Sequence, residues 1–261
     1  MYVTKWDGRK ERFDRNKVLR TCLRLGANLS QARSVVNSIE QKIWDGIETR
    51  KIYRMIEEEL GKISIEFRYK RNLRDAIASL KPKPDFELFV RKILGREFRV
   101  KGNLIIEGKC CEYEIDGVLE RGGEKLMLEI KHHANPHTPT PLDVVLECFA
   151  KLLDINEKEK TFDGVMIVCN TKFSYHAKMF AECRGIKLLG WKYPEKRGLE
   201  SIIWRDKLYP ISFLKPLTEE ELSKFTENGI VLLKELKEGD AIELSKRTGI
   251  EKERIEECRS S

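Results

Sequence analysis

Residues 112–131 read EYEIDGVLERGGEKLMLEIK. Apolar and polar side chains alternate along residues 112–120, and residues 125–131 are rich in Leu, Met and Ile, as is typical of two β-strands. Gly122-Gly123 separates them, and a pair of glycines favours the two-residue turn of a tight hairpin. We therefore predict an antiparallel hairpin over this stretch.

The two-residue turn fixes which residues face each other across the hairpin. It places Asp116 opposite Glu129. Two residues further along, it places Glu114 opposite Lys131. Directly opposed side chains have β-carbons about 4.5–5.5 Å apart, and residues two apart on a strand share a face. One face of the hairpin should therefore gather three carboxylates and a lysine.

Such a gathering of negative charge is costly unless a cation neutralises it. Mg²⁺ or Mn²⁺ fits, because hard divalent cations prefer oxygen ligands and Mg²⁺ is commonly held by one or two carboxylates. The ion can polarise a phosphodiester and help to generate hydroxide, while a lysine offsets developing charge. The alternative is a solvated charged face with an ion pair between Glu114 and Lys131, although the apolar run at 126–128 favours a buried second strand.

Helices and strands are predicted on both sides of the hairpin from the spacing of apolar residues. In the first helix Glu87 stands four residues before Arg91, so the two can form an ion pair. Pro141 suits the first position of the second helix, with Thr140 as its cap. The predicted elements are a helix at 85–94, strands at 98–100 and 103–107, a helix at 142–153 and a strand at 164–168.

Several segments of this region resemble a known nuclease family. Asp116, followed after twelve residues by Glu129-Ile130-Lys131, resembles the signature of the PD-(D/E)xK nucleases. The strand at 164–168, the sequence NTKFSxxA from Asn170 and the sequence RGIKLL at 184–189 extend the likeness to the Mrr-type restriction endonucleases. The resemblance covers most of residues 81–215.

The resemblance to Mrr-type enzymes implies both a fold and an activity. The fold would be α/β, with an α/β/α core around a mixed sheet, and the activity that of a metal-dependent endonuclease acting on double-stranded DNA. Asp116 and Glu129 would bind Mg²⁺ or Mn²⁺, and Lys131 would be the catalytic lysine. Glu87 and Glu114 would be accessory acids.

The first 80 residues predict a β-hairpin followed by four helices. Asp7-Gly8 is a favoured two-residue turn, and the strands are expected at 2–6 and 9–13. A side-chain oxygen that accepts a hydrogen bond from a free backbone N–H can cap a helix start. The residues that can cap the first three helices are Asp14, Ser30 and Thr49, and the fourth helix is expected at 64–80.

This N-terminal region resembles the ATP-cone, the nucleotide-binding regulatory module of ribonucleotide reductases and their repressor. The likeness lies in VxKxDG from Val3 and, four residues later, in FDxxKV from Phe13. It implies that ATP or dATP binds here, and the residues assigned to the site are Val3, Lys5, Trp6, Arg9 and Lys17. The family has a basic residue where this chain has Trp6, which can stack on a base instead. The alternative is a solvated basic hairpin that binds no nucleotide.

Charge and proline positions divide the 261 residues into three predicted domains. The net charge is +7, and residues 1–80 contain 18 Lys/Arg against 11 Asp/Glu, whereas the rest contains 32 of each. A polyanion would therefore be attracted to the N-terminal region. Prolines near residues 82 and 216 interrupt helices. The predicted domains are an ATP-cone-like domain at 1–80, a nuclease-like domain at 81–215 and an acidic helical tail, similar to a helix-hairpin-helix module, at 216–261.

Other features bound the location and the function. No apolar run is long enough to span a membrane, and the N-terminus lacks the apolar stretch of a signal peptide, so we expect a cytoplasmic protein. Seven cysteines without a CxxC pair argue against a disulfide framework and a zinc ribbon. A nucleotide-sensing DNA-binding regulator with an inactive nuclease core and a Holliday-junction resolvase-like nuclease stay open as alternatives. A homodimer is expected, because cutting both strands generally needs two active sites.

Overall fold

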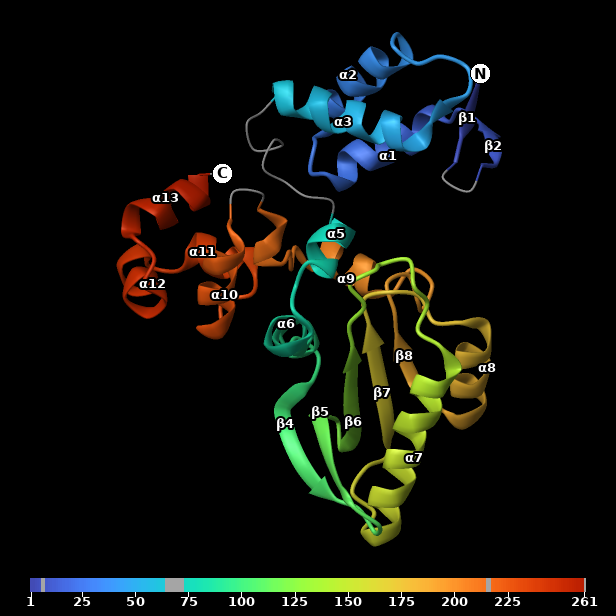
Figure 1. The fold of residues 1–261 in the computed structure, drawn as a ribbon, viewed down its shortest axis with the longest axis vertical. Helices are drawn as coiled ribbons and strands as arrows, with labels where there is room; N and C mark the ends of the chain where they lie inside the picture. The colour runs from blue at the N-terminus through green and yellow to red at the C-terminus, as the bar shows by residue number, and fades with distance from the viewer. Residues whose placement is uncertain (6–7, 64–72, 215–216, 261) are drawn as a thin grey trace. The chain divides into compact units, whose positions relative to one another are not determined.

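The computed structural model describes residues 1–5, 8–63, 73–214 and 217–260. The chain divides into two compact units (Figure 1). Of the described residues, the first unit contains those up to 63 together with Leu214 and 257–260, and the second contains 73–213 and 217–256. Among the described helices, none is both long and apolar enough to cross a membrane.

The described N-terminal residues up to 63 form a small sheet and three helices. Strand β1 pairs antiparallel with β2 and parallel with β3, which gives the order β2-β1-β3. Apolar side chains from the sheet and the helices form one core, with Val3, Cys22, Ile39 and Ile56 almost fully buried. The elements are β1 (Tyr2–Thr4), β2 (Lys10–Arg12), α1 (Arg15–Arg24), α2 (Leu29–Glu40), β3 (Ile47–Glu48) and α3 (Thr49–Ile63).

Helix starts in the first unit follow the predicted caps in part. Asp14 caps α1, and its carboxylate accepts a hydrogen bond from the Asn16 N–H at 2.8 Å. The predicted cap at Ser30 is wrong, because α2 begins earlier, at Leu29, and Asn28 is its cap. Asn28 accepts from the Gln31 N–H and Gln31 accepts from the Asn28 N–H, both at 2.9 Å. This reciprocal pair satisfies two free donors at once, which a serine inside the helix cannot do.

Most of the predicted fourth helix lies outside the described residues. The helix was predicted at 64–80, and the described part of the chain does not include residues 64–72. Its remainder forms α5 (Leu73–Ala78), which belongs to the second unit.

The second unit contains a five-stranded mixed sheet with helices on both faces (Figure 1). The strand order is β4-β5-β6-β7-β8, antiparallel from β4 to β6 and parallel from β6 to β8. Helices α7 and α8 pack on one face, and α6 and α9 lie on the other. The elements are η1 (Pro82–Phe86), α6 (Glu87–Leu94), β4 (Arg99–Glu107), β5 (Glu112–Arg121), β6 (Glu124–Lys131), α7 (Leu142–Lys158), β7 (Gly164–Cys169), α8 (Tyr175–Arg184), β8 (Lys187–Leu189) and α9 (Leu199–Asp206).

The predicted hairpin is confirmed, with the predicted register from the turn to Gly117, whereas the predicted pairs Asp116–Glu129 and Glu114–Lys131 lie beyond the end of the ladder. Arg121 pairs with Glu124 across the turn, and the ladder runs back to the pair of Gly117 and Leu128. The two short strands predicted before the hairpin form the single strand β4. Thr140 does not cap α7, because Pro141 occupies the cap position.

The β4–β5 ladder is interrupted beside Asp116. Asn103 has a φ of 47°, and the ladder passes from the pair Gly102–Gly117 to the pair of Leu104 and Ile115 without it. An Arg91 nitrogen donates to the Asn103 side-chain oxygen at 2.9 Å and to the Asp116 carbonyl at 3.2 Å. The guanidinium therefore satisfies groups that the ladder leaves open.

Short helices form the C-terminal part of the chain. Thr218 and Glu221 make the reciprocal hydrogen bonds of a capping box at the start of α10. Helix α10 packs against η1, and Lys92 of α6 pairs with Glu235 of α11. The elements are η2 (Ile211–Phe213), α10 (Glu219–Glu227), α11 (Leu233–Glu238), α12 (Ala241–Thr248) and α13 (Lys252–Ser260).

The cap of α2 can be tested with two neighbouring substitutions. Asn28→Ala should lower the free energy of unfolding by about 1 kcal/mol, because it removes the side chain that holds the first turn. Ser30→Ala should change it by less than about 0.5 kcal/mol, because Ser30 is an exposed residue inside the helix. Urea unfolding followed by circular dichroism gives both values, and equal losses for the two variants would contradict the assignment.

Candidate functional site

Asp116 lies on β5 at the point where the β5–β6 ladder ends. Its Oδ2 atom accepts a hydrogen bond from the Ile130 N–H at 2.7 Å. The residue is 7% exposed. Its neighbour must be a glycine, because a Cβ at Gly117 would lie 2.6 Å from the Lys101 carbonyl oxygen. The Asp116 carboxylate thus replaces a backbone carbonyl as the acceptor for the Ile130 N–H. Its other oxygen, Oδ1, is left for another contact.

Glu129 lies on β6 and is 4% exposed. Its Oε1 atom accepts hydrogen bonds from Lys131 Nζ at 2.8 Å and from Lys151 Nζ at 3.3 Å. Its Oε2 atom is buried and has no hydrogen-bond partner among the described residues. A buried carboxylate oxygen without a partner is costly, so Oε2 is suited to bind a cation.

Sequence reasoning missed Lys151. It projects from α7 and is largely buried, and Glu147 lies 3.5 Å away. The available signal was its position close to Cys148 and Leu152, which are buried on the helix that follows Lys131. A lysine beside such a buried stripe needs an acidic partner.

Glu114 and Glu87 converge on Lys83, which was not predicted as a site residue. Lys83 Nζ lies 2.9 Å from Glu114 Oε1, 3.3 Å from Glu87 Oε1 and 3.6 Å from Asp116 Oδ1. The ion pair considered between Glu114 and Lys131 is therefore not formed. Lys131 pairs with Glu129 on its own strand, two residues away, and Glu114 pairs with Lys83.

Glu87 also forms the predicted pair with Arg91, at 3.3 Å. The two contacts use different oxygens, Oε1 for Lys83 and Oε2 for Arg91. The structure thus places the four predicted acids in two groups. Glu87, Glu114 and Asp116 lie around Lys83, and Glu129 pairs with Lys131 and Lys151. We call these four acids with Lys83, Lys131 and Lys151 the acidic cluster.

Burial and charge act in opposite directions within the acidic cluster. Burial raises the pKa of Asp116, and this outweighs the hydrogen bond from Ile130, which lowers it. Burial alone would lower the pKa of Lys131, but its hydrogen bond and ion pair with Glu129 raise it overall. The same balance raises the pKa of Lys151, with Glu129 again as the main partner. Both lysines are therefore held in the charged form at neutral pH.

Asp116 and Glu129 have the donors that a hard divalent cation needs. No group of three or more His, Cys, Asp or Glu side chains is arranged around a common metal position within the described ranges. Mg²⁺ does not require such a group, because it keeps several waters and is commonly held by one or two carboxylates. Glu129 Oε2 has no partner among the described residues, and Asp116 Oδ1 has Lys83 at 3.6 Å. Both are carboxylate oxygens, which is the donor type that such an ion takes.

Two of the predicted nucleotide residues, Lys5 and Lys17, contact one acid, Glu11. Lys5 Nζ lies 2.8 Å from Glu11, and Lys17 Nζ lies 3.0 Å from it. The hydrogen bonds from Lys5 and Lys17 lower the pKa of Glu11. Arg9 is exposed, Val3 is buried in the core, and the predicted residue Trp6 lies outside the described residues.

A small cavity of about 210 Å³ lies beside Lys5 in the first unit. Thr49 and Arg50 line it at the start of α3, where backbone N–H groups favour an anion. Its lining also includes Thr4 and Glu48. A volume of this size suits phosphate groups. Neither Thr49 nor Arg50 was assigned to the nucleotide from the sequence.

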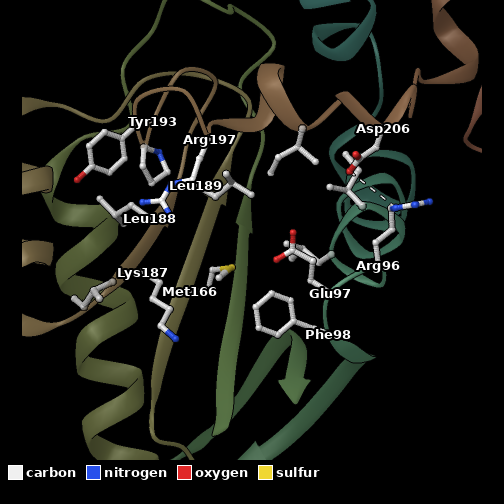
Figure 2. Close-up of a pocket in the computed structure, with 15 residues that line it drawn as sticks. Arg96, Glu97, Phe98, Met166, Lys187, Leu188, Leu189, Tyr193, Arg197 and Asp206 are labelled. Atoms are coloured by element: carbon white, nitrogen blue, oxygen red, sulfur yellow. Dashed lines mark ion pairs between the residues drawn. The ribbon is translucent and has the colours of Figure 1, made fainter. Parts of the chain in front are cut away.

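A cavity of about 560 Å³ lies on the α6 and α9 face of the sheet in the second unit (Figure 2). Met166 and Leu189 form part of its apolar wall, and Arg96 pairs with Asp206 at 3.9 Å beside it. None of the acidic cluster lines this cavity. It is therefore separate from the candidate metal centre.

Comparisons with known proteins match both ends of the chain. A family model described as the ATP cone domain matches residues 1–79. A second model, described as AF1548-like, C-terminal, matches residues 209–260. The first match confirms the predicted ATP-cone and indicates that the N-terminal region binds nucleotides.

Two individual proteins are similar over larger parts of the chain. An uncharacterized protein from Archaeoglobus fulgidus is 41% identical over 139 residues, which cover 53% of this chain and 78% of that relative. The crystal structure of a protein of unknown function, AF1548, is 34% identical with a TM-score of 0.61 and covers 72% of this chain and 95% of that chain. Neither description names an activity.

Glu11 provides a test of the nucleotide site. Glu11→Gln should tighten ATP binding several-fold, because it removes a negative charge near the phosphates and releases Lys5 and Lys17. Calorimetric titration of the full chain with ATP and dATP measures the change. Glu40→Gln is the matched control, since Glu40 pairs with Arg15 at 3.0 Å in the same unit. Unchanged or weaker binding by the Glu11 variant would contradict the assignment of these lysines.

Proposed function

We propose that this chain, which belongs to the family of AF1548-like proteins, is a metal-dependent DNA endonuclease with a nucleotide-binding regulatory unit. The proposal rests on one observation above others. Asp116 and Glu129, two buried carboxylates on neighbouring strands, each have an oxygen suited to a cation, and Lys131 lies beside them. This arrangement agrees with the resemblance to the PD-(D/E)xK enzymes of the Mrr type.

Each residue of the candidate metal centre would have a distinct chemical role. Asp116 and Glu129 would hold Mg²⁺ or Mn²⁺, and the ion would polarise the scissile phosphate and lower the pKa of water. Lys131 Nζ, 2.8 Å from Glu129, would orient the attacking water and offset charge that develops on the phosphate. Glu114 and Glu87 act at a distance from the ion, through Lys83.

The position of Lys151 supports these roles. It shares Glu129 Oε1 with Lys131, so that two positive charges hold one oxygen and leave the other to the cation. Because Lys151 comes from α7 and Lys131 from β6, the carboxylate is fixed from two elements. Fixed carboxylates need little reorganisation when the ion and the phosphate arrive.

The ATP-cone at residues 1–79 binds nucleotides, and we propose that ATP or dATP regulates cleavage. The substrate would be double-stranded DNA, and a homodimer would supply two centres for the two strands. A branched DNA, as cut by junction resolvases, is the related substrate for a direct comparison.

A regulator without catalysis is the second candidate function. The observation that favours it is Lys83, which lies within 4 Å of three carboxylates and already neutralises part of the acidic cluster. In this case nucleotide binding would alter DNA affinity, and the second unit would serve as a scaffold.

Cleavage of supercoiled plasmid in the presence of Mg²⁺ tests the nuclease. The wild type should nick the plasmid, and the double variant Asp116→Ala/Lys131→Ala should be slower by about a hundredfold or more, because it loses a ligand and the lysine. Equal nicking by the two proteins would overturn the proposal.

A matched double variant controls for general effects of charge removal. Glu124→Ala/Lys187→Ala also removes one acid and one lysine, from a pair 2.5 Å apart near the hairpin turn. It should nick at the wild-type rate, with and without added ATP. Tight ATP binding by a wild type that cuts no DNA would instead support the regulator.

A further inference from the structure

Lys83 occupies an unusual position for a lysine in a proline-rich turn. It lies in η1, between Pro82 and Pro84, and its ammonium group faces Glu87, Glu114 and Asp116. The side chains of Glu87 and Asp116 are only 3% and 9% exposed, whereas that of Lys83 is 55% exposed. The ammonium group therefore reaches the buried carboxylates from a side chain that is more than half exposed to solvent.

The backbone around Lys83 is held in place by several contacts. The Lys81 N–H donates to Asp85 Oδ2 at 3.2 Å, and the Phe86 N–H donates to the Lys81 carbonyl at 3.0 Å. Lys81 Nζ also donates to Ser223 Oγ on α10 at 2.8 Å. These contacts fix the backbone on both sides of Lys83 and therefore hold Lys83 beside the acids.

The oxygen that Lys83 faces is the one that a metal would need. Asp116 Oδ2 is used by the Ile130 N–H, so Oδ1 is the oxygen left for a cation, and Lys83 Nζ lies 3.6 Å from it. Lys131 and Lys151 differ in this respect. Both bind Glu129 Oε1 and leave Oε2 open.

We propose that Lys83, which is hydrogen-bonded to Glu114 and lies 3.6 Å from Asp116 Oδ1, competes directly with the divalent cation for the Asp116 carboxylate. A divalent cation on Asp116 Oδ1 would strongly repel an ammonium group that lies 3.6 Å from the same oxygen, so Lys83 withdraws as the ion binds. Metal affinity is thereby set by a residue that is not a ligand. The inference rests on the proposed function only in placing the cation at Asp116.

Calorimetric titration of the full chain with Mn²⁺ tests this competition. Lys83→Met should bind Mn²⁺ about tenfold more tightly than the wild type, because the competing charge is lost. Lys187→Met is the matched control, since Lys187 pairs with Glu124 near the hairpin turn, outside the acidic cluster. Its Mn²⁺ affinity should equal that of the wild type. Circular dichroism confirms that the variants are folded.

A third variant locates the gain in affinity. Adding Asp116→Asn to Lys83→Met should remove the gain, because the amide that replaces the carboxylate lacks the contested charge. The inference is overturned if Lys83→Met binds Mn²⁺ no more tightly than the wild type, if the gain survives Asp116→Asn, or if neither protein binds Mn²⁺. Tighter Mn²⁺ binding by Lys83→Met in a protein that cuts no DNA would support the competition and refute the nuclease.

Discussion

The hydrogen bond from the Ile130 N–H to Asp116 Oδ2 is the interaction on which the candidate centre depends. It ends the β5–β6 ladder and draws the carboxylate into the sheet at a depth where few charged groups are tolerated. On the other side of β5, the left-handed Asn103 interrupts the β4–β5 ladder at the same level. Asp116 thus lies where both ladders of one strand are broken, and a side chain replaces backbone partners there.

A buried carboxylate at such a break requires positive charge nearby, and the chain supplies it from three elements. Lys131 comes from β6, Lys151 from α7 and Lys83 from η1. The first two hold Glu129, whereas Lys83 faces Asp116 and Glu114. Even though residues 81–261 contain equal numbers of basic and acidic side chains, the local balance around each carboxylate differs. Glu129 Oε1 accepts hydrogen bonds from two lysines, whereas Glu129 Oε2 has no partner among the described residues and is open to a cation.

Local patterns in the sequence predicted the parts of this arrangement that depend on neighbours in the chain. The two-residue turn at Gly122-Gly123 fixed the hairpin register, because it determines which residues of the two strands lie opposite each other. The roles of Lys83 and Lys151 depend on contacts with Glu114 and Glu129, which lie 31 and 22 positions away, and no local pattern encodes them. The cap of α2 was missed for another reason: Asn28 and Ser30 both suit a cap, and only the reciprocal bond with Gln31 selects Asn28.

The most direct test of the metal centre is a crystal of the protein soaked in Mn²⁺, with anomalous diffraction measured at the manganese edge. The account predicts an anomalous peak about 2.0–2.2 Å from Asp116 Oδ1 and Glu129 Oε2, with Lys83 Nζ displaced from its present position. Anomalous peaks confined to other carboxylates, with Lys83 still 3.6 Å from Asp116, would contradict it.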